Sequence, residues 1–397
     1  MPQYVVTDNE MTRVANAIRS KAGITTSLTY PYDFINKINN ITEKPTDTPN
    51  NLVATGITSF SSTMTAIGSY AFANCQSLRS VSCSLCYSIS MSAFYYCDKL
   101  KDISFPKCQY IYAGAFEMCR ALKSIDFPKC KSIGSAAFSW CTGLAVISLP
   151  VCTYIGEGAF DTAGSPNVTI KSVYMPEVTS VAAYAFNGFG LDLPSFSKCK
   201  YIGRAAFAHT RFESISFPVC TSLERGAFSY CTKLLTATFP VLTSIGGSAF
   251  EYCSKLTTVS FPACKSIESN AFYNCSALTT VSFPVCTSIG NGAFTSCSAL
   301  TSVSFPACTS IGSYAFARCS ALTTASFPAC TTIGPYAFQS ANANLKLYLL
   351  GNKVATMGYQ AFYAIYSTVT IYVNSSLVNS YKTATNWASI STRIYAG

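Results

Sequence analysis

The sequence is poor in histidine and in charge. One histidine, His209, stands among 397 residues, and Asp, Glu, Lys and Arg together make up 11% of the chain. We therefore expect neither histidine-based triads nor multi-histidine metal sites. The chain also lacks a P-loop, a GxGxxG that follows a strand, and an acidic pair typical of glycosidases. These absences predict no enzyme activity, no cofactor and no metal.

Long apolar runs are also missing. No run approaches the ~18–20 residues that a bilayer-spanning helix needs, although 49% of residues are hydrophobic and the mean hydropathy is +0.29. The start, MPQYVVTDNEMTR, lacks the basic and apolar regions of a secretory signal. We expect no membrane insertion and folding in a cytoplasm. A net charge of +10, spread over a long body, is weak support for anionic partners, and we expect no nucleic-acid partner.

What the chain has in abundance is repetition. The unit TSIGNGAFTSCSALTSVSFPAC (287–308) recurs through most of the sequence, and an Ala-Phe pair marks each of fourteen copies. The repeat phenylalanines are residues 72, 94, 116, 138, 160, 186, 207, 228, 250, 272, 294, 316, 338 and 362. A fixed period of this length predicts a solenoid in which each unit adds a strand and a short helix or 3₁₀ turn. Spacing departs from 22 residues around 160–228, so we expect the regular face to be bent or interrupted there.

The unit itself indicates which side chains face the core. Leu300, Val303 and Phe305 alternate with small polar residues, which is typical of a short strand, and Pro306 closes it. Ile289 and Phe294 are expected to reach the same core from the opposite wall. One unit cannot bury these groups alone, but neighbours stacked at ~4.8 Å bury them on both sides. We predict about fourteen 22-residue units that form a parallel β-sheet solenoid.

The two ends depart from the repeat. Helical patterns at 7–23 and 31–41 predict a small αα-hairpin. We expect a helical module over 1–45, a linker over 46–52, the solenoid over 53–344, and a capping repeat and helix over 345–397. Atypical terminal units of this kind are required by solenoids. The final helix is expected to begin at a serine cap.

Nearly all of the twenty cysteines occupy two repeat positions. One lies three residues after the repeat phenylalanine, and the other follows Phe-Pro-x. Leu242 and Phe189 stand at equivalent positions and cannot bind metal or form a disulfide. Free cysteine behaves as a small buried hydrophobe. We therefore favour buried reduced thiols over disulfides and metal ligands.

The AFxxCxxLxxVSFPxC unit resembles the BspA-like leucine-rich repeats over about residues 65–340. The segment MTRVANAIRSKAGITTSLTYPYDFINKI is similar to a short module at the start of phage tail proteins, through Lys21–Gly23 and Pro31–Phe34. IYVNSSLVNSYKTATNW resembles the closing motif of the same repeat proteins, with Asn374 where that motif has proline. The resemblance implies a surface-recognition protein and favours a virion. Residues 1–45 would then dock on virion tail proteins through apolar side chains, namely Met11, Val14, Ile18, Phe34, Ile35 and Ile38.

Three sets of outward residues are candidates for a binding surface. Strand hydroxyls are predicted to form ladders at Thr258, Ser260, Thr280, Ser282, Ser302, Ser304, Thr324 and Ser326. They make either a concave platform for a glycan or protein, or an ordinary sheet surface without a ligand. Aromatic residues beside the Ala-Phe pairs are Tyr96, Trp140, Tyr230, Tyr252, Tyr273, Tyr314 and Tyr336. They either contact a partner or stack over the gaps between repeats.

The third set is basic. Arg79, Lys101 and Lys123 recur at one repeat position. Like charges so close repel one another, which hints at an anionic partner such as a cell-wall polymer or an acidic virion protein. Ordinary solvated side chains are the alternative.

Together these features predict a non-enzymatic phage tail adhesin or fibre. It would be assembled in the bacterial cytoplasm, reside in the virion tail, and recognise a host-surface glycan or protein through the solenoid. The sequence does not decide whether the protein forms a homo-oligomer in the virion. The alternatives are a bacterial BspA-like surface adhesin, and a structural virion protein whose repeats contact other virion subunits.

Overall fold

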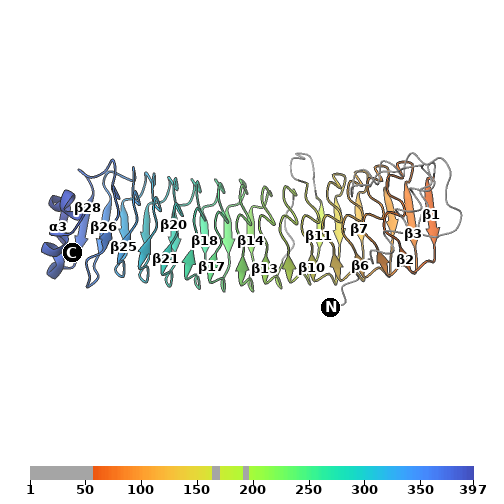
Figure 1. Cartoon of the computed structure of the whole chain (residues 1–397), viewed down its shortest axis with the longest axis horizontal. Helices are drawn as coiled ribbons and strands as arrows, with labels where there is room; N and C mark the ends of the chain where they lie inside the picture. The colour runs from red at the N-terminus through yellow and green to blue at the C-terminus, as the bar shows by residue number, and fades with distance from the viewer. Residues whose placement is uncertain (1–56, 163–169, 191–195) are drawn as a thin grey trace, which may run out of the picture.

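The computed structural model describes residues 57–162, 170–190 and 196–397. They form an elongated parallel β-solenoid of about fifteen turns (Figure 1). The predicted hairpin and linker, with the six docking residues between Met11 and Ile38, lie outside the described residues. The residue boundaries of the four predicted units stay predictions.

One side of each turn is a strand, and these strands make up what we call the strand wall. Within each of its four sheets, neighbours pair in register and in parallel, as Val281, Val303 and Ala325 do. The inward residue of each strand is apolar and the residues beside it point outward, as predicted. The strands are β1 (Ser59–Ser62), β3 (Ser80–Cys83), β5 (Asp102–Ser104), β7 (Ser124–Asp126), β9 (Val146–Ser148), β11 (Ser172–Tyr174), β14 (Ser214–Ser216), β16 (Thr236–Thr238), β18 (Thr258–Ser260), β20 (Thr280–Ser282), β22 (Ser302–Ser304), β24 (Thr324–Ser326), β26 (Lys346–Leu349), β28 (Thr370–Val373) and β29 (Ile394–Ala396).

A second set of parallel strands, two residues each, follows the cysteine after Phe-Pro-x. We call it the short-strand wall, and it turns one apolar residue per rung inward, such as Ile289. These strands are β2 (Ala66–Ile67), β4 (Ser88–Ile89), β6 (Tyr110–Ile111), β8 (Ser132–Ile133), β10 (Tyr154–Ile155), β12 (Ser180–Val181), β13 (Tyr201–Ile202), β15 (Ser222–Leu223), β17 (Ser244–Ile245), β19 (Ser266–Ile267), β21 (Ser288–Ile289), β23 (Ser310–Ile311), β25 (Thr332–Ile333) and β27 (Thr356–Met357).

The Ala-Phe segment forms neither a helix nor a 3₁₀ turn in the described repeats, which corrects that part of the prediction. Residues two before and two after the phenylalanine are left-handed, as at Ser92 (φ 51°) and Tyr96 (φ 56°). Left-handed residues break a helix. They also aim N–H groups at the next turn, where Ser92 donates to the Ala113 carbonyl and Tyr96 to the Glu117 carbonyl, both at 2.9 Å. The result is a third hydrogen-bonded face, which we call the turn wall.

Phenylalanine fills the core in two stacks. From Phe72 to Phe362 each repeat phenylalanine stacks on the next, with ring centroids 5.0–5.6 Å apart. A second stack comes from the Phe-Pro residues, such as Phe283 on Phe305 at 5.6 Å. Such offset rings are preferred over a face-to-face sandwich. Every unit therefore extends one continuous core.

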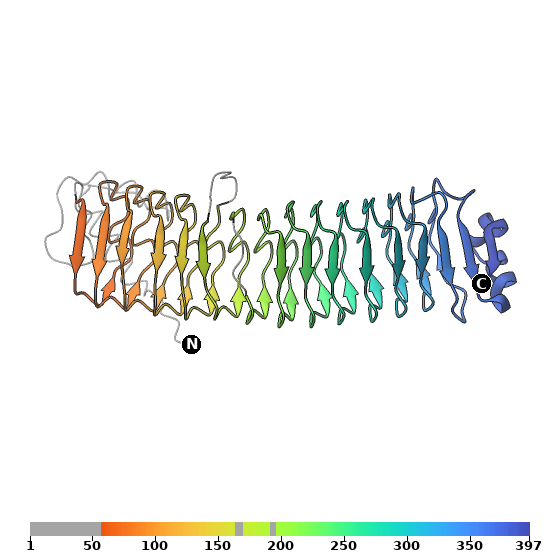
Figure 2. The ribbon, with the colours of Figure 1, turned by 180° about the vertical axis from the view of Figure 1, so that it is seen from behind.

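The irregular region interrupts one wall only. Phe160 stacks on Phe186 at 5.1 Å across the extra residues, and on the short-strand wall β10 pairs with β12 and β12 with β13. On the strand wall β11 and β14 belong to separate sheets, and residues 191–195 between them lie outside the described residues. The core therefore continues through the irregular region. Separate sheets also meet between β5 and β7 and between β18 and β20, where the repeat is regular. The rod is nearly straight when seen from either side (Figure 2).

All twenty cysteines are buried and free. In the first ladder the thiol donates to a carbonyl one turn back, as Cys297 does to Phe272 at 3.2 Å. In the second ladder it donates two residues ahead, as Cys308 does to Ser310 at 3.3 Å. Burial raises the pKa of the Cys308 thiol to about 12. The predicted packing role is confirmed.

Helices close the C-terminal end of the rod (Figure 1). They are η1 (Ser375–Leu377), α3 (Val378–Thr383) and η2 (Trp387–Arg393). The cap residue is Asn374 rather than the expected serine, and its side-chain oxygen accepts the N–H of Ser376 at 3.1 Å. The cap binds the last turn through Trp387, whose indole N–H donates to the Ala355 carbonyl at 2.7 Å, and through Tyr381, whose hydroxyl accepts the Ala355 N–H at 3.0 Å.

Candidate binding surface

The predicted hydroxyls form two columns on the outer face of the strand wall. Thr280 pairs with Ser302 and Ser282 with Ser304, so residues of one column lie directly above one another. Six of the eight predicted side chains are exposed, and Thr324 and Ser326 are half-buried. The columns continue over β14 and β16, which the sequence analysis missed although the strand pattern is present there. The added hydroxyls are Ser214, Ser216, Thr236 and Thr238.

These hydroxyls differ from others nearby. In neighbouring columns the hydroxyls donate hydrogen bonds to the preceding turn. Thr301 donates to the Thr279 carbonyl at 3.3 Å, and Thr309 donates to the Thr287 carbonyl at 3.1 Å. The two strand-wall columns make no side-chain hydrogen bond with any described residue. Their donors and acceptors are therefore free for an external partner. In the plane of the two views the rod has no marked bend (Figures 1 and 2). The concave shape of the platform stays a prediction.

Most predicted aromatic residues stack on one another along the turn wall. His209 stacks on Tyr230 at 4.9 Å and Tyr230 on Tyr252 at 4.7 Å, with ring planes within 14°. Tyr314 and Tyr336 stack at 4.9 Å. Each ring covers the face of its neighbour, so a sugar has no ring face to lie on within a stack. The structure favours the interpretation that these rings stack over the gaps between repeats.

Three predicted aromatic residues lie outside such stacks. Tyr273 meets Tyr252 edge-on, at 5.4 Å and 62°. Tyr96 lies beneath the Arg120 guanidinium at 5.3 Å, a cation–π contact. Trp140 is 38% exposed and has no aromatic partner in the described chain. These residues do not form one platform.

The predicted basic residues line one edge of the strand wall. Arg79, Lys101 and Lys123 immediately precede β3, β5 and β7, and all three are exposed. The Lys101 N–H donates to the Arg79 carbonyl at 2.8 Å, which places these two residues on adjacent turns. None of the three forms an ion pair within the described chain, where the two pairs are Arg120–Asp98 and Lys198–Glu177.

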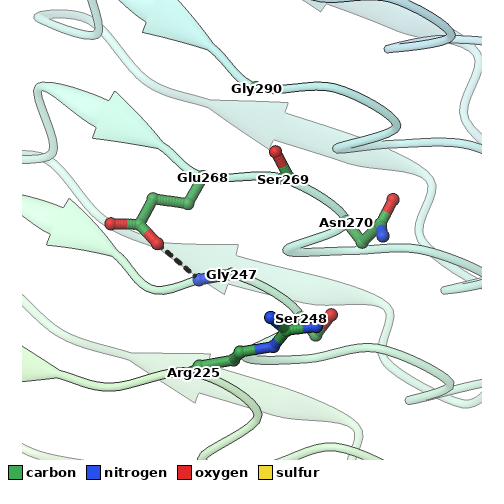
Figure 3. Close-up of a pocket in the computed structure, with 7 residues that line it drawn as sticks. All are labelled: Arg225, Gly247, Ser248, Glu268, Ser269, Asn270 and Gly290. Carbon is green, nitrogen blue, oxygen red and sulfur yellow. Dashed lines mark hydrogen bonds between the residues drawn. The ribbon is translucent and has the colours of Figure 1, made fainter.

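A shallow depression of about 410 Å³ lies where the short-strand wall meets the turn wall. There the Glu268 carboxylate accepts the Gly247 N–H at 2.9 Å (Figure 3). The lining is Arg225, Gly247, Ser248, Glu268, Ser269, Asn270 and Gly290. This depression was not predicted from the sequence, because its residues are ordinary repeat positions. Its one carboxylate is engaged with backbone, so the depression has no evident catalytic group.

The described residues contain neither a metal-binding cluster nor a membrane-spanning helix. Within 57–162, 170–190 and 196–397, no three His, Cys, Asp or Glu side chains are arranged to hold a metal ion. No helix in these same ranges has the length and apolar character needed to cross a membrane.

Comparisons with known proteins agree with this architecture. The family model described as a BspA-type leucine-rich repeat region matches residues 54–165, 153–279, 200–307 and 265–389. A leucine-rich repeat protein from Bacteroides ovatus is similar in structure, with 28% identity and a TM-score of 0.57, over 74% of this chain and 87% of that one. A leucine-rich cell surface protein from Faecalibacterium prausnitzii aligns at 24% identity and a TM-score of 0.40, over 68% and 79%. No protein with a curated description matches the chain.

Proposed function

Because the chain belongs to the BspA-type leucine-rich repeat family, we propose that it is a non-enzymatic binding protein of the adhesin type. It recognises a glycan or protein on a cell surface through the strand wall. The observation that carries this proposal is the pair of hydroxyl columns on β14 to β24, which are exposed or half-buried and unused by the fold.

The geometry favours many shallow contacts over one deep site. Serine and threonine hydroxyls both donate and accept hydrogen bonds, so each turn offers the same polar pair to a partner that lies along the rod. Single contacts of this kind are weak, but linked contacts add avidity without a pocket. The two rows at Thr280–Ser302 and Ser282–Ser304 show the in-register repeat that such binding requires.

We propose two settings for this function. In the first, residues 1–45 dock on a virion tail and the solenoid recognises the host; the similarity of the N-terminal segment to phage tail modules supports it. In the second, the protein is a bacterial surface adhesin, and membership of the repeat family supports this setting at least as well. A structural virion role is a third candidate, in which the same wall contacts virion subunits.

The setting is tested by location. An antibody against the solenoid is applied to purified virions and to intact producing bacteria. Labelled virions support the first setting, and labelled bacteria without labelled virions support the second. Virion labelling together with no binding of the purified chain to any cell would favour the structural role.

The binding wall is tested by a matched pair of double variants of the full chain. Ser282→Glu with Ser304→Glu places two carboxylates on the strand wall. Thr232→Glu with Thr243→Glu adds the same charge at exposed residues outside the wall. We expect the wall variant to bind intact bacteria or epithelial cells at least tenfold more weakly than the control variant. Equal binding by the two variants would place recognition elsewhere.

A further inference from the structure

Charge is distributed unevenly along the solenoid. Residues 79–131 carry eight cations and four carboxylates, whereas residues 269–345 carry a single charged side chain, Arg318. All eight cations are exposed. They are Arg79, Lys99, Lys101, Lys107, Arg120, Lys123, Lys129 and Lys131.

Five of these cations border the strand wall. Arg79, Lys101 and Lys123 precede β3, β5 and β7 on one edge, and Lys107 and Lys129 follow Phe-Pro on the other edge. We call this region, with the outward residues between its edges, the cationic strip. Like charges on turns whose backbones lie ~4.8 Å apart repel one another. The fold itself gains nothing from this repetition, because none of the five forms an ion pair with a described residue.

Two carboxylates stand inside the strip, Asp102 on β5 and Asp126 on β7. Neither forms an ion pair with a described residue. Five cations against two carboxylates leave the strip with an excess of positive charge. The other outward residues of these strands are serines, of which Ser82, Ser104 and Ser124 are exposed.

We propose that the cationic strip binds an anionic polysaccharide that lies along the rod. This inference rests on the proposed function and names one partner class for the strand wall. Anionic groups along the polymer meet one edge cation per turn, and its hydroxyls meet the serines between the edges. Asp102 and Asp126 repel anionic groups, so we expect the strip to favour a polysaccharide of moderate charge density.

Two other polyanions fit less well. Single-stranded nucleic acids are held by aromatic side chains that stack on bases, and the outward residues of β3, β5 and β7 are serine and aspartate. An acidic protein surface is anchored by buried aromatic or arginine side chains, whereas the five cations of the strip are all exposed. Both are therefore arms of the test.

The test measures affinity of the full chain for dextran sulfate, with uncharged dextran as the backbone control, at physiological salt. The strip variant is Arg79→Gln with Lys101→Gln and Lys123→Gln. The matched variant, Lys233→Gln with Lys255→Gln and Lys265→Gln, removes the same charge from exposed residues on later turns. We expect dextran sulfate binding without dextran binding, a loss of at least tenfold in the strip variant, and less than twofold in the matched variant. Circular dichroism and melting of both variants should match the parent chain, because all six side chains are exposed.

Several outcomes overturn the proposal. Equal losses in the two variants would show a response to net charge alone. Tighter binding of oligo(dT) or polyglutamate than of dextran sulfate would assign the strip to another polymer. If the full chain does not bind dextran sulfate, the proposal that the strip binds an anionic polysaccharide is rejected. The cell-binding test of the Ser282 and Ser304 variant is independent of this one. If that variant binds cells as well as its control while the strip variant loses dextran sulfate binding, the strip proposal stands and the proposed function is rejected. If the cell-binding test succeeds and dextran sulfate does not bind, the proposed function stands and the strip proposal is rejected.

Discussion

At the scale of the residue, the backbone of each turn determines which side chains a position accepts. The position two before the repeat phenylalanine is left-handed and carries glycine at Gly226 (φ 66°), yet serine at Ser248 and asparagine at Asn270. Asparagine tolerates this conformation better than most residues. Gly334 is different, because a side chain there would lie 2.5–2.6 Å from the backbone of the preceding turn.

These two glycines make a matched test. Gly334→Ala should lower the free energy of unfolding by about 3 kcal/mol, because backbone must shift to admit the methyl group. Gly226→Asn should cost only about 1 kcal/mol, for the left-handed backbone, because the nearest atom to an added side chain is the Ser229 hydroxyl oxygen at 3.5 Å. Urea titration followed by circular dichroism measures both. Equal costs would contradict the stacking distances between turns.

The buried thiols make a second prediction at this scale. Burial raises the pKa of Cys264 and of Cys308 from 9.0 to about 12, so the reactive thiolate is scarce at pH 8. Because the folded chain holds these thiols in the neutral form, their burial contributes fully to stability below pH 9, and this contribution is lost as the pH rises toward 12. We expect Ellman's reagent to label almost no thiol of the native chain at pH 8 and all twenty after denaturation. Rapid native labelling would contradict the burial of the ladders.

At the scale of the element, the C-terminal cap should stabilise the last turns. Trp387→Ala removes a fully buried ring and its hydrogen bond to Ala355, and such truncations cost about 3–5 kcal/mol. We expect a lower melting temperature and concentration-dependent light scattering, because the edge of the last rung becomes accessible. Tyr395→Ala, an exposed residue of β29, is the control. Unchanged scattering in the Trp387 variant would show that the cap is dispensable.

The sequence predicted the elements that depend on side-chain period. Alternation at Leu300, Val303 and Phe305 predicted the strand wall, and the fixed position of each cysteine in the repeat predicted that it is buried. The turn wall could not be predicted in the same way, because residues as different as Tyr96, Met118 and Ser296 adopt the same left-handed conformation. Hydrogen bonds to the next turn impose that geometry whatever the side chain is.

The candidate site was predictable in composition and not in chemistry. The sequence located the outward hydroxyls, but only the structure separates Thr301, whose hydroxyl bonds to backbone, from the adjacent Ser302, whose hydroxyl does not. Likewise the aromatic residues were found by position, and the stacking of Tyr230 on Tyr252 decides that their faces are covered. Contacts between turns are not visible in a single repeat.

At the scale of the molecule, the uninterrupted phenylalanine stack should couple the two halves of the rod. Each turn contacts its neighbours only, so cooperativity passes through the interfaces between turns. Phe250→Ala opens a cavity in mid-stack at a cost of about 3–5 kcal/mol. We expect the parent chain to unfold in one transition and the variant in two.

The two tryptophans report these transitions separately. Trp140 lies before Phe250 in the chain and Trp387 after it, so Trp140→Phe and Trp387→Phe backgrounds each leave one fluorescent reporter. In the Phe250→Ala variant the two reporters should give different midpoints. Coincident midpoints would mean that the halves remain coupled through the walls alone.

The hydrogen bonds between turns run along the length of the rod, so a load applied to its two ends opens them one turn at a time. Each released turn of 22 residues frees about 70 Å of extended chain. A tether built this way lengthens in steps under tension. The same stacking of turns that buries the phenylalanines would thus let the molecule extend stepwise under load.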